Sequence, residues 1–315
     1  MMQSDDAPDD DPKAAASPTS EAVAQRVSVD LVRRLTEPLA PGLYLVATPI
    51  GNLADITLRA LATLARADVI YCEDTRHSRT LVAHYGITRT LRPYHEHNAE
   101  EQRPRILADL ARGARIALIS DAGTPLVSDP GYKLVRDCIA EGHTVVAIPG
   151  ASAVMTGICV AGLPTDTFLF AGFLPPRSGA RQTRIAELAS VPATLIFFEA
   201  PTRLAETLAD LATTLGHRPA AVARELTKLH EHIARGPLSD LAAHFENAPP
   251  KGEIVILVGP PGNEAVTDEA IIAALENALA HMSLRDAAKA VAERLSAPKA
   301  RVYDLGLKLK ADRTG

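Results

Sequence analysis

The stretch Ile119-Ser-Asp-Ala-Gly-Thr-Pro-Leu-Val-Ser-Asp-Pro-Gly131 decides how this chain folds. It follows the apolar run 115–119, which is typical of a buried strand, and it precedes residues 132–140, whose apolar residues recur at helical spacing. Gly and Pro residues fix turns in this loop, and its Ser, Asp and Thr side chains supply polar groups that a simple connection does not need. Open α/β sheets bind ligands at the carboxyl ends of their strands, so we expect a small polar molecule to be held here.

The same alternation of strand and helix recurs on both sides of this loop. Strands that alternate with helices predict a mostly parallel sheet that is covered on both faces. We therefore predict an α/β fold with an N-terminal α/β domain at 41–155 and a C-terminal α/β domain, with a mixed sheet, at 156–262. The strand candidates that carry the prediction are 43–47, 68–72, 143–148, 168–170, 193–198, 220–223 and 253–258.

Both ends of the chain differ from this α/β body. Residues 1–40 are rich in Asp, Pro, Ala and Ser, and we interpret them as a disordered acidic extension because they cannot bury enough apolar surface to fold. Residues 263–315 are helical in pattern, include the capping sequence Ser283-Leu-Arg-Asp286, and hold more basic than acidic side chains after residue 280. They predict a small helix-turn-helix-like domain that binds RNA, contacts a second subunit or exposes a solvated face.

Composition excludes several classes of protein. The three Cys residues are far apart, so they encode neither a disulfide framework nor a zinc site. No apolar run reaches membrane-spanning length and the acidic start is unlike a signal peptide, so we expect a cytoplasmic protein with no membrane partner. Aromatic residues make up 4% and Trp is absent, which argues against a single-strand stacking platform as the main purpose of the fold. The pairs His95/His97 and His230/His232 lack an obvious third ligand, so we predict no metal site.

Five blocks of sequence, in this order and spacing, resemble the ribosomal RNA small subunit methyltransferase I family of the tetrapyrrole methylase superfamily. The similarity covers residues 42 to about 260, and the helical tail is similar to the family's helix-turn-helix extension. The resemblance implies S-adenosylmethionine as cofactor in a cleft between two α/β domains, and a homodimer. It also implies methylation of a cytidine ribose 2′-hydroxyl in the decoding region of 16S ribosomal RNA, in the small ribosomal subunit. The blocks are 47–53, 73–76, 120–131, 149–153, and 224–228 together with 251–253.

The resemblance also assigns residues to the cofactor. S-adenosylmethionine needs many small and differently polarised contacts rather than a phosphate cradle, and no G-x-G-x-x-G fingerprint follows the first strand. Two glycines in these loops would let the ligand approach the main chain, whereas the alternative is a set of simple turns. The cofactor residues that the resemblance implies are Pro49, Ser120, Asp121, Ala122, Gly123, Thr124, Pro149, Gly150, Ala151, Ser152 and Ala153.

No pattern singles out a catalytic base. Methyl transfer from a sulfonium is an in-line displacement, for which positioning supplies much of the catalysis, and an acceptor for the hydroxyl proton helps. By resemblance and polarity, four acidic or imidazole side chains are candidate catalytic residues. Two basic side chains are also candidates, although they are better suited to binding phosphate. These candidates are Glu73, Arg76, His97, Glu199, Glu225 and Lys228.

Two segments carry candidate contacts to RNA phosphates. One is a basic loop that we expect to be mobile after Phe173-Leu-Pro-Pro176, and the other is the helical tail. Two other functions stay open: a tetrapyrrole-type small-molecule methylase, against which the basic tail and Arg76 argue, and a non-catalytic RNA-binding assembly factor, against which the intact cofactor blocks argue. The candidate RNA contacts are Arg177, Arg181, Arg184, Arg285, Lys289, Lys299 and Arg301.

Overall fold

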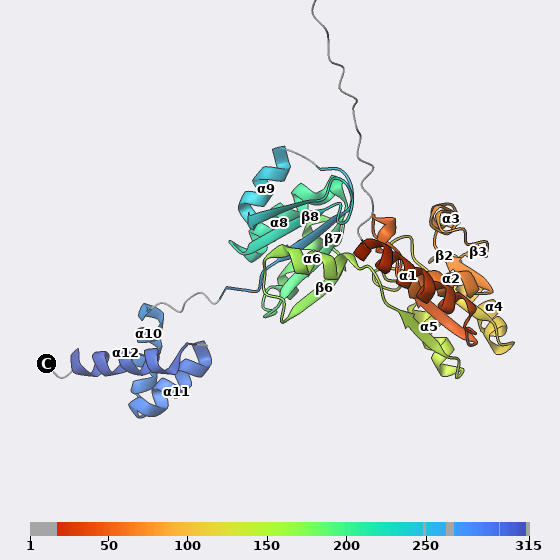
Figure 1. Ribbon diagram of the computed structural model, residues 1–315. Coiled ribbons are helices and arrows are strands. Elements are labelled where there is room, and N and C mark those ends of the chain that lie inside the picture. Colours follow the sequence, from red (N-terminus) through yellow and green to blue (C-terminus); the bar gives the residue numbers. More distant parts are fainter. Residues whose placement is uncertain (1–17, 248–249, 263–267, 296, 313–315) are drawn as a thin grey trace, which may run out of the picture.

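The computed structural model describes residues 18–247, 250–262, 268–295 and 297–312. Two α/β domains follow one another along the chain, and a small helical domain comes after them (Figure 1). This architecture agrees with the α/β class and the helical tail that the sequence predicts.

The first sheet is entirely parallel, with the strand order β3-β2-β4-β1-β5. Alternate residues of each strand enter separate cores on its two faces: Tyr44 and Val46 pack on one side and Leu43 on the other. The edge strand β3, Thr-Leu-Arg-Pro, was not predicted, because it is mostly exposed and lacks an apolar run. The elements are β1 (Gly42–Val46), α2 (Leu58–Arg66), β2 (Val69–Cys72), α3 (Thr75–His84), β3 (Thr90–Pro93), α4 (Ala99–Ala111), β4 (Arg115–Leu118), α5 (Tyr132–Ala140) and β5 (Val145–Ile148).

The second sheet is mixed, as predicted, with the order β6-β7-β10-β8-β9 and only the β6–β7 pair parallel. Helices α7, α8 and α9 share a core with one face of this sheet, while α6 packs on the other face. The expected division at residue 155 therefore falls inside α6, a helix that belongs to the second sheet. The elements are α6 (Ala153–Ala161), β6 (Phe168–Phe173), α7 (Ser178–Leu188), β7 (Thr194–Glu199), α8 (Leu204–Leu215), β8 (Pro219–Arg224), β9 (His232–Pro237), α9 (Leu238–Asn247) and β10 (Ile254–Val258).

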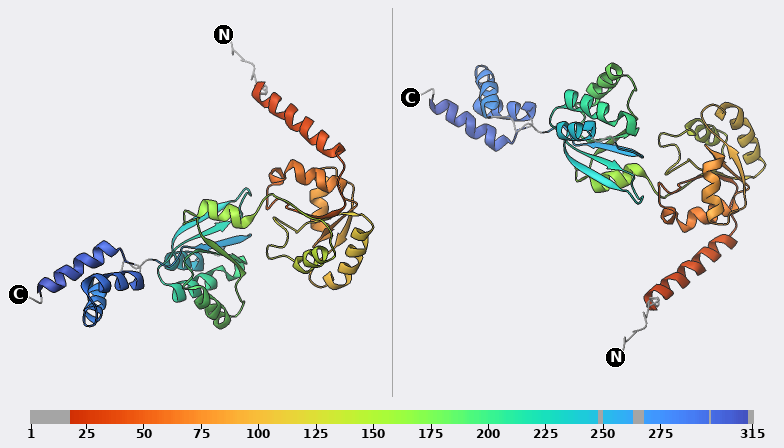
Figure 2. Two further views of the ribbon diagram at one scale, coloured as in Figure 1. Left: turned by 90° about the horizontal axis from the view of Figure 1, so that it is seen from below. Right: turned by 90° about the horizontal axis from the view of Figure 1, so that it is seen from above.

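Helix α1 (Pro18–Thr36) corrects the prediction of disorder for this part of the N-terminal extension. It packs on α2, where Arg66 donates a hydrogen bond to the carbonyl oxygen of Arg34, and Figure 2 shows its first turns projecting beyond the domain. Asp30 forms ion pairs with Arg33 and Arg34 at i+3 and i+4, which support a helix whose valine side chains are largely exposed. Residues 1–17 of the predicted extension lie outside the described residues.

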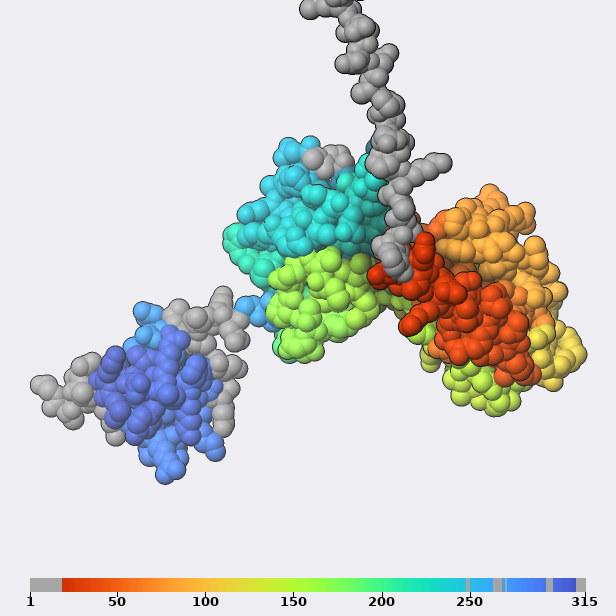
Figure 3. Space-filling model, in the orientation of Figure 1, coloured from red at the N-terminus to blue at the C-terminus, as the bar shows by residue number. Residues whose placement is uncertain are grey.

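The tail forms a three-helix domain around its own apolar core. Ser283 caps α11, since its Oγ accepts from the backbone N–H of Asp286 at 3.3 Å, which agrees with the predicted capping sequence. Figure 3 shows this domain as a body separate from the two α/β domains. No helix within the described ranges is long and apolar enough to span a membrane. The helices are α10 (Asp268–Leu279), α11 (Leu284–Leu295) and α12 (Lys299–Asp312).

Candidate active site

The loops that follow β1, β4 and β5 are joined to one another at the carboxyl edge of the first sheet. Thr48 and Gly123 exchange two backbone hydrogen bonds, of 2.8 and 3.1 Å, which tie the first loop to the second. Thr124 Oγ1 donates to the carbonyl oxygen of Ala151 at 3.1 Å, which ties the second loop to the third. Because β1 lies between β4 and β5 in the sheet, these loops form one continuous surface.

A pocket of about 440 Å³ lies between this surface and the second sheet. Its volume falls in the range of small-molecule sites. The second domain contributes the ends of β6 and β7 and parts of β8 and β10. The predicted cofactor residues that line the pocket are Asp121, Ala122, Gly123, Thr124, Ser152 and Ala153.

The remaining predicted cofactor residues, Pro49, Ser120, Pro149, Gly150 and Ala151, do not line the pocket. Ser120 is 3% exposed and donates to the carbonyl oxygen of Ala122, so it shapes the loop from within. A Cβ atom at Gly150 would lie 3.0 Å from Ala47 Cβ. Packing of this turn against the end of β1 thus explains why residue 150 is a glycine. The close approach of a ligand, which we expected, is not needed as an explanation.

Three carboxylates converge on the pocket from the first domain: Glu73, Asp121 and Asp129. Burial, together with the nearby charges of Asp129 and Asp121, raises the pKa of Glu73 to about 7. Burial also raises the pKa of Asp129, which hydrogen-bonds to Glu73. Since the two carboxyl groups are buried and adjacent, each opposes ionisation of the other.

Asp129 is a pocket residue that the sequence-based choice of site residues missed. The loop reaches it through Leu126 and Ser128, which have positive φ angles of 72° and 69°. Non-glycine residues adopt this left-handed conformation at a cost, and such strain is concentrated at functional sites. The polar character of the loop was a signal, but the sequence does not show that Asp129, as well as Asp121, lines the pocket.

The wall from the second domain is mostly apolar and includes two aromatic rings, with Glu199 and Glu253 as its acidic residues. The ring centroids of Phe170 and Phe173 lie 4.7 and 5.7 Å from that of Phe198. Phe173 and Phe198 line the pocket, and Phe173 stays 57% exposed. A register shift between Phe170 and Phe173 interrupts the pairing of β6 with β7 and accompanies this placement. The pocket thus combines three carboxylates of the first domain with two aromatic rings of the second domain.

Glu199 also borders the pocket, but its carboxylate does not suit a catalytic base. Its side chain has no exposed surface, Oε1 accepts from the backbone N–H of Ala200 at 2.8 Å, and Oε2 accepts from Thr207 Oγ1 at 2.6 Å. Arg203 Nη2 lies 3.2 Å from the same Oε2. Both oxygens thus already accept hydrogen bonds from protein donors, which argues against the candidate role of Glu199 as a base.

Glu225 and Lys228 form an ion pair outside the pocket lining. Lys228 Nζ lies 2.9 Å from Glu225 Oε1 and 3.3 Å from Glu253 Oε2, and the hydrogen bond from Lys228 keeps the pKa of Glu225 below its usual value. Gly252 has a φ of +96°, and any Cβ there would collide with the Glu225 carboxylate, which explains a glycine between Lys251 and Glu253. This pair braces the rim of the pocket, where Glu253 itself is a lining residue.

Arg76 and His97 lie outside the pocket lining as well. Arg76 is 90% exposed and pairs with Asp74 at 2.8 Å. Asp74 caps α3 by accepting from the backbone N–H of Arg76. His97 is exposed beside the ring of His95, and no group of three possible metal-ligating side chains occurs within the described ranges.

The structure separates the candidate RNA contacts into buried and exposed side chains. Arg181 is only 1% exposed and its Nε lies 2.6 Å from Asp210 Oδ2, so its prediction as an RNA contact is wrong. Arg301 pairs with Asp268, and Arg184 with Glu187. The other candidates, Arg177, Arg285, Lys289 and Lys299, are exposed or partly exposed.

Comparison with known families identifies both parts of the chain. Residues 42–242 match the family of Tetrapyrrole (Corrin/Porphyrin) Methylases, and residues 264–310 match the RsmI C-terminal HTH domain. Among solved structures, the fold resembles a cobalt precorrin-4 methyltransferase (TM-score 0.54, 19% identity, 69% of this chain and 94% of that one). It also resembles a diphthine synthase (TM-score 0.56, 17% identity, 69% of this chain and 89% of that one).

Curated relatives are much more similar in sequence. A protein of Mesorhizobium japonicum named ribosomal RNA small subunit methyltransferase I is 54% identical, over 87% of this chain and 94% of its own. A protein of the same name from Halalkalibacterium halodurans is 42% identical, over 84% of this chain and 93% of its own. These matches extend through both α/β domains and the tail, and they confirm the resemblance seen in the sequence blocks. The chain belongs to the ribosomal RNA small subunit methyltransferase I family, within the tetrapyrrole methylases.

Proposed function

We propose that this protein transfers the methyl group of S-adenosylmethionine to the 2′-hydroxyl of a cytidine ribose in the decoding region of 16S ribosomal RNA. Membership of the family supports the reaction class and the ribosomal RNA substrate. The observation that carries the proposal is the pocket between the two domains, where three carboxylates of the first domain face an aromatic wall. A fold retained only for binding would not need to keep such a group of mutually repelling carboxylates.

The pocket residues fit this cofactor. S-adenosylmethionine has an ammonium and a sulfonium cation, and Glu73, Asp121 and Asp129 supply negative charge at one side of the pocket. The backbone of residues 121–124 and the Ser152–Ala153 turn supply small polar groups for its other functions. The bound cofactor provides the electrophilic methyl group, while the chain positions the acceptor and receives its proton.

We infer that Glu73 is the proton acceptor for the 2′-hydroxyl. The pKa of Glu73 is about 7 in the free protein and falls when the cationic cofactor binds, so the carboxylate is ionised and able to accept a proton in the complex at neutral pH. The hydrogen bond to Asp129 orients the Glu73 carboxyl. Lys228 and Glu225 brace the rim, whereas Arg76 and His97 follow β2 and β3 at the same sheet edge and contact the RNA beyond the pocket.

The substrate is the assembled small ribosomal subunit, because a ribose in the decoding region adopts its final shape only there. The exposed Arg285, Lys289 and Lys299 of the helical tail contact phosphates, and Arg177 and Arg184 of the second domain do the same. We further propose that the enzyme acts as a homodimer in the cytoplasm.

Methyl transfer to purified ribosomal subunits tests the proposal. Subunits from a strain that lacks this chain should miss one cytidine ribose methyl group, and the purified protein with S-adenosylmethionine should restore it, as measured by mass spectrometry of RNA digests. The Glu73→Gln variant should bind the cofactor yet restore the methyl group at least about a hundredfold more slowly, the usual scale for loss of a general base. Identical ribosomal RNA in the two strains would reject the proposed substrate, and methylation of a tetrapyrrole instead would favour the small-molecule alternative.

A further inference from the structure

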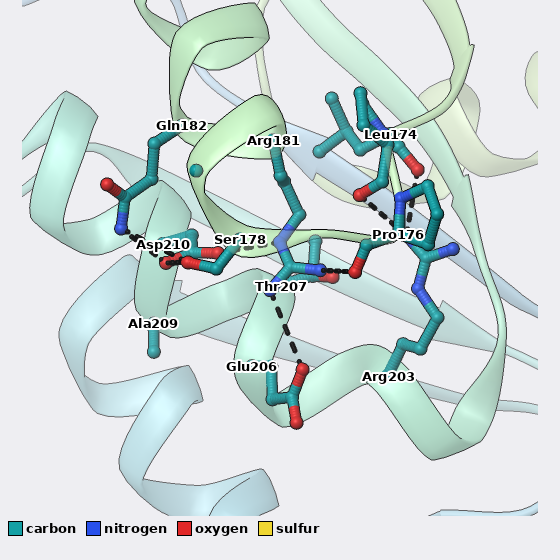
Figure 4. Close-up of polar contacts among 12 residues, drawn as sticks. Leu174, Pro176, Ser178, Arg181, Gln182, Arg203, Glu206, Thr207, Ala209 and Asp210 are labelled. Carbon is teal, nitrogen blue, oxygen red and sulfur yellow. Dashed lines mark hydrogen bonds and ion pairs between the residues drawn. The ribbon is translucent and has the colours of Figure 1, made fainter.

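The pocket-wall segment, residues 173–177, is held by two arginines through three successive carbonyl groups. Arg203 Nη2 donates to the carbonyl oxygens of Leu174 and Pro175 at 2.8 and 3.3 Å. Arg181 Nη1 donates to the carbonyl oxygen of Pro176 at 3.2 Å, and Figure 4 shows the two guanidinium groups on the same stretch of backbone. The segment that the sequence suggested to be mobile is therefore anchored at each of these residues.

The anchoring follows from the two prolines. Pro175 and Pro176 have no N–H group and cannot extend the ladder of β6, so the segment leaves the sheet with unpaired carbonyl groups. Guanidinium groups satisfy these carbonyls, and their planar fork limits how far the backbone can move. The segment Phe173-Leu-Pro-Pro-Arg177 is thus ordered only when arginines of other helices bind its carbonyl groups.

Both arginines are themselves held by buried acids. The carboxylate of Glu199, which Thr207 also contacts, fixes Arg203. Asp210 fixes Arg181 and accepts further hydrogen bonds from Ser178 and Gln182, as drawn in Figure 4. Burial opposes ionisation of Asp210, yet these hydrogen bonds keep its pKa below the usual value. The acids and arginines make a rigid support behind one wall of the pocket.

The residue that this support presents to the pocket is Phe173. Its ring is more than half exposed, although the neighbouring Leu174 is 2% exposed and belongs to the core of the second domain. Exposing an aromatic ring to water inside a pocket is unfavourable unless a ligand covers it. Phe198, whose ring packs against that of Phe173, is only partly exposed, so Phe173 is the more accessible of the two rings that line the pocket.

We propose that Arg203 is a positioning residue that holds Phe173 in place to stack on the nucleobase of the target nucleotide. This inference rests on the proposed function. Enzymes that modify RNA take up unstacked bases by placing them against aromatic rings, and a planar base fits the exposed face of Phe173. The carboxylates on the opposite side of the pocket attract the cationic cofactor, which leaves the aromatic side for the base.

The test compares Phe173→Leu, Arg203→Lys and the double variant, with Arg218→Lys as a matched control. Arg218 is also a buried arginine of the second domain, 8% exposed, but it donates to the carbonyl oxygen of Ala189, away from the pocket. Lysine keeps a charge beside Glu199 and loses the fork that holds two carbonyls. The measurements are KM and kcat on ribosomal subunits, Kd for S-adenosylmethionine, and amide hydrogen exchange of peptides that cover residues 170–178.

We expect Phe173→Leu and Arg203→Lys each to raise KM for subunits about tenfold, near the lower end of the effect of losing one base–aromatic stack. Kd for the cofactor should stay within about twofold. The double variant should be no worse than Phe173→Leu alone, because Arg203 acts through the ring. Arg203→Lys should speed amide exchange at 173–178, and Arg218→Lys should change neither this exchange nor KM.

Distinct results would overturn the proposal. Fully additive effects in the double variant would mean that Arg203 acts by another route, and an equal loss of cofactor affinity would place the ring against the cofactor. Unchanged amide exchange in Arg203→Lys would exclude the positioning role, and this measurement does not depend on methyl transfer. A wild-type protein that transferred no methyl group to subunits would instead reject the proposed function.

Discussion

Binding of the cofactor should release protons near neutral pH, because the carboxylates of the pocket are only partly ionised before it binds. The pKa of Glu73 is about 7, so at pH 7 about half of the molecules carry a proton on this group. A cation favours the ionised form of a nearby carboxylate. The perturbation is therefore the arrival of the sulfonium and ammonium charges beside Glu73.

The size of the effect follows from the charge and the surroundings. A unit charge about 5 Å away, at an effective dielectric constant of about 20, stabilises a carboxylate by about 3 kcal/mol, or roughly 2 pKa units. The pKa of Glu73 should then fall below neutral pH, and binding at pH 7 should release up to about half a proton. At pH 9 the group is already ionised in the free protein, so the release should vanish. S-adenosylhomocysteine, which lacks the sulfonium charge, should release less.

Isothermal titration calorimetry in phosphate and in Tris measures this release, since the binding enthalpy differs between buffers in proportion to the protons exchanged. Glu73→Gln should remove the buffer dependence. The control Glu101→Gln changes an exposed carboxylate that pairs with Arg105 and should leave the release intact. Equal enthalpies in both buffers at pH 7 for the wild type, or an undiminished release in Glu73→Gln, would refute the reasoning.

Three further predictions address stability and RNA binding. The pKa of Glu73 in the folded protein is about 7, above the value of 4.5 for the free group, so the free energy of unfolding should fall as pH rises from about 4.5 to about 7. Glu73→Gln should therefore raise the urea midpoint of unfolding at pH 8 but not at pH 4. Arg181→Met should lower the free energy of unfolding by about 3–5 kcal/mol, because it leaves the Asp210 carboxylate buried without its cation. A loss under about 1 kcal/mol in urea titrations would show that this ion pair does not stabilise the fold. Deleting the chain after residue 262 should leave cofactor affinity unchanged in calorimetry and should weaken subunit binding in filter assays. The loss of subunit binding should become smaller as the salt concentration rises. Normal binding at every salt concentration would assign the tail another role.

Local patterns in the sequence were enough for the architecture. Apolar runs of strand length, helical spacing and polar turns specify most of the elements from within a few residues, although not β3 or α1. For this reason the parallel first sheet and the mixed second sheet were both predicted. The same local logic placed the loop at 119–131 at a strand end, and the pocket indeed lies there. It also gave the capping role of Ser283, because a cap acts within one helical turn.

Only the tertiary structure decided which polar side chains face the pocket. Arg181 and the exposed Arg184 lie one helical turn apart. Arg181 is nevertheless buried, because it pairs with Asp210, which is 29 positions away in the sequence. Glu199 is turned inward by Thr207 and Arg203, which follow it in the chain. Helix α1, which the composition assigned to a disordered extension, packs on α2 of the first domain. In each case the partner lies on another element, and burial depends on the arrangement of elements, which spacing along one segment does not encode.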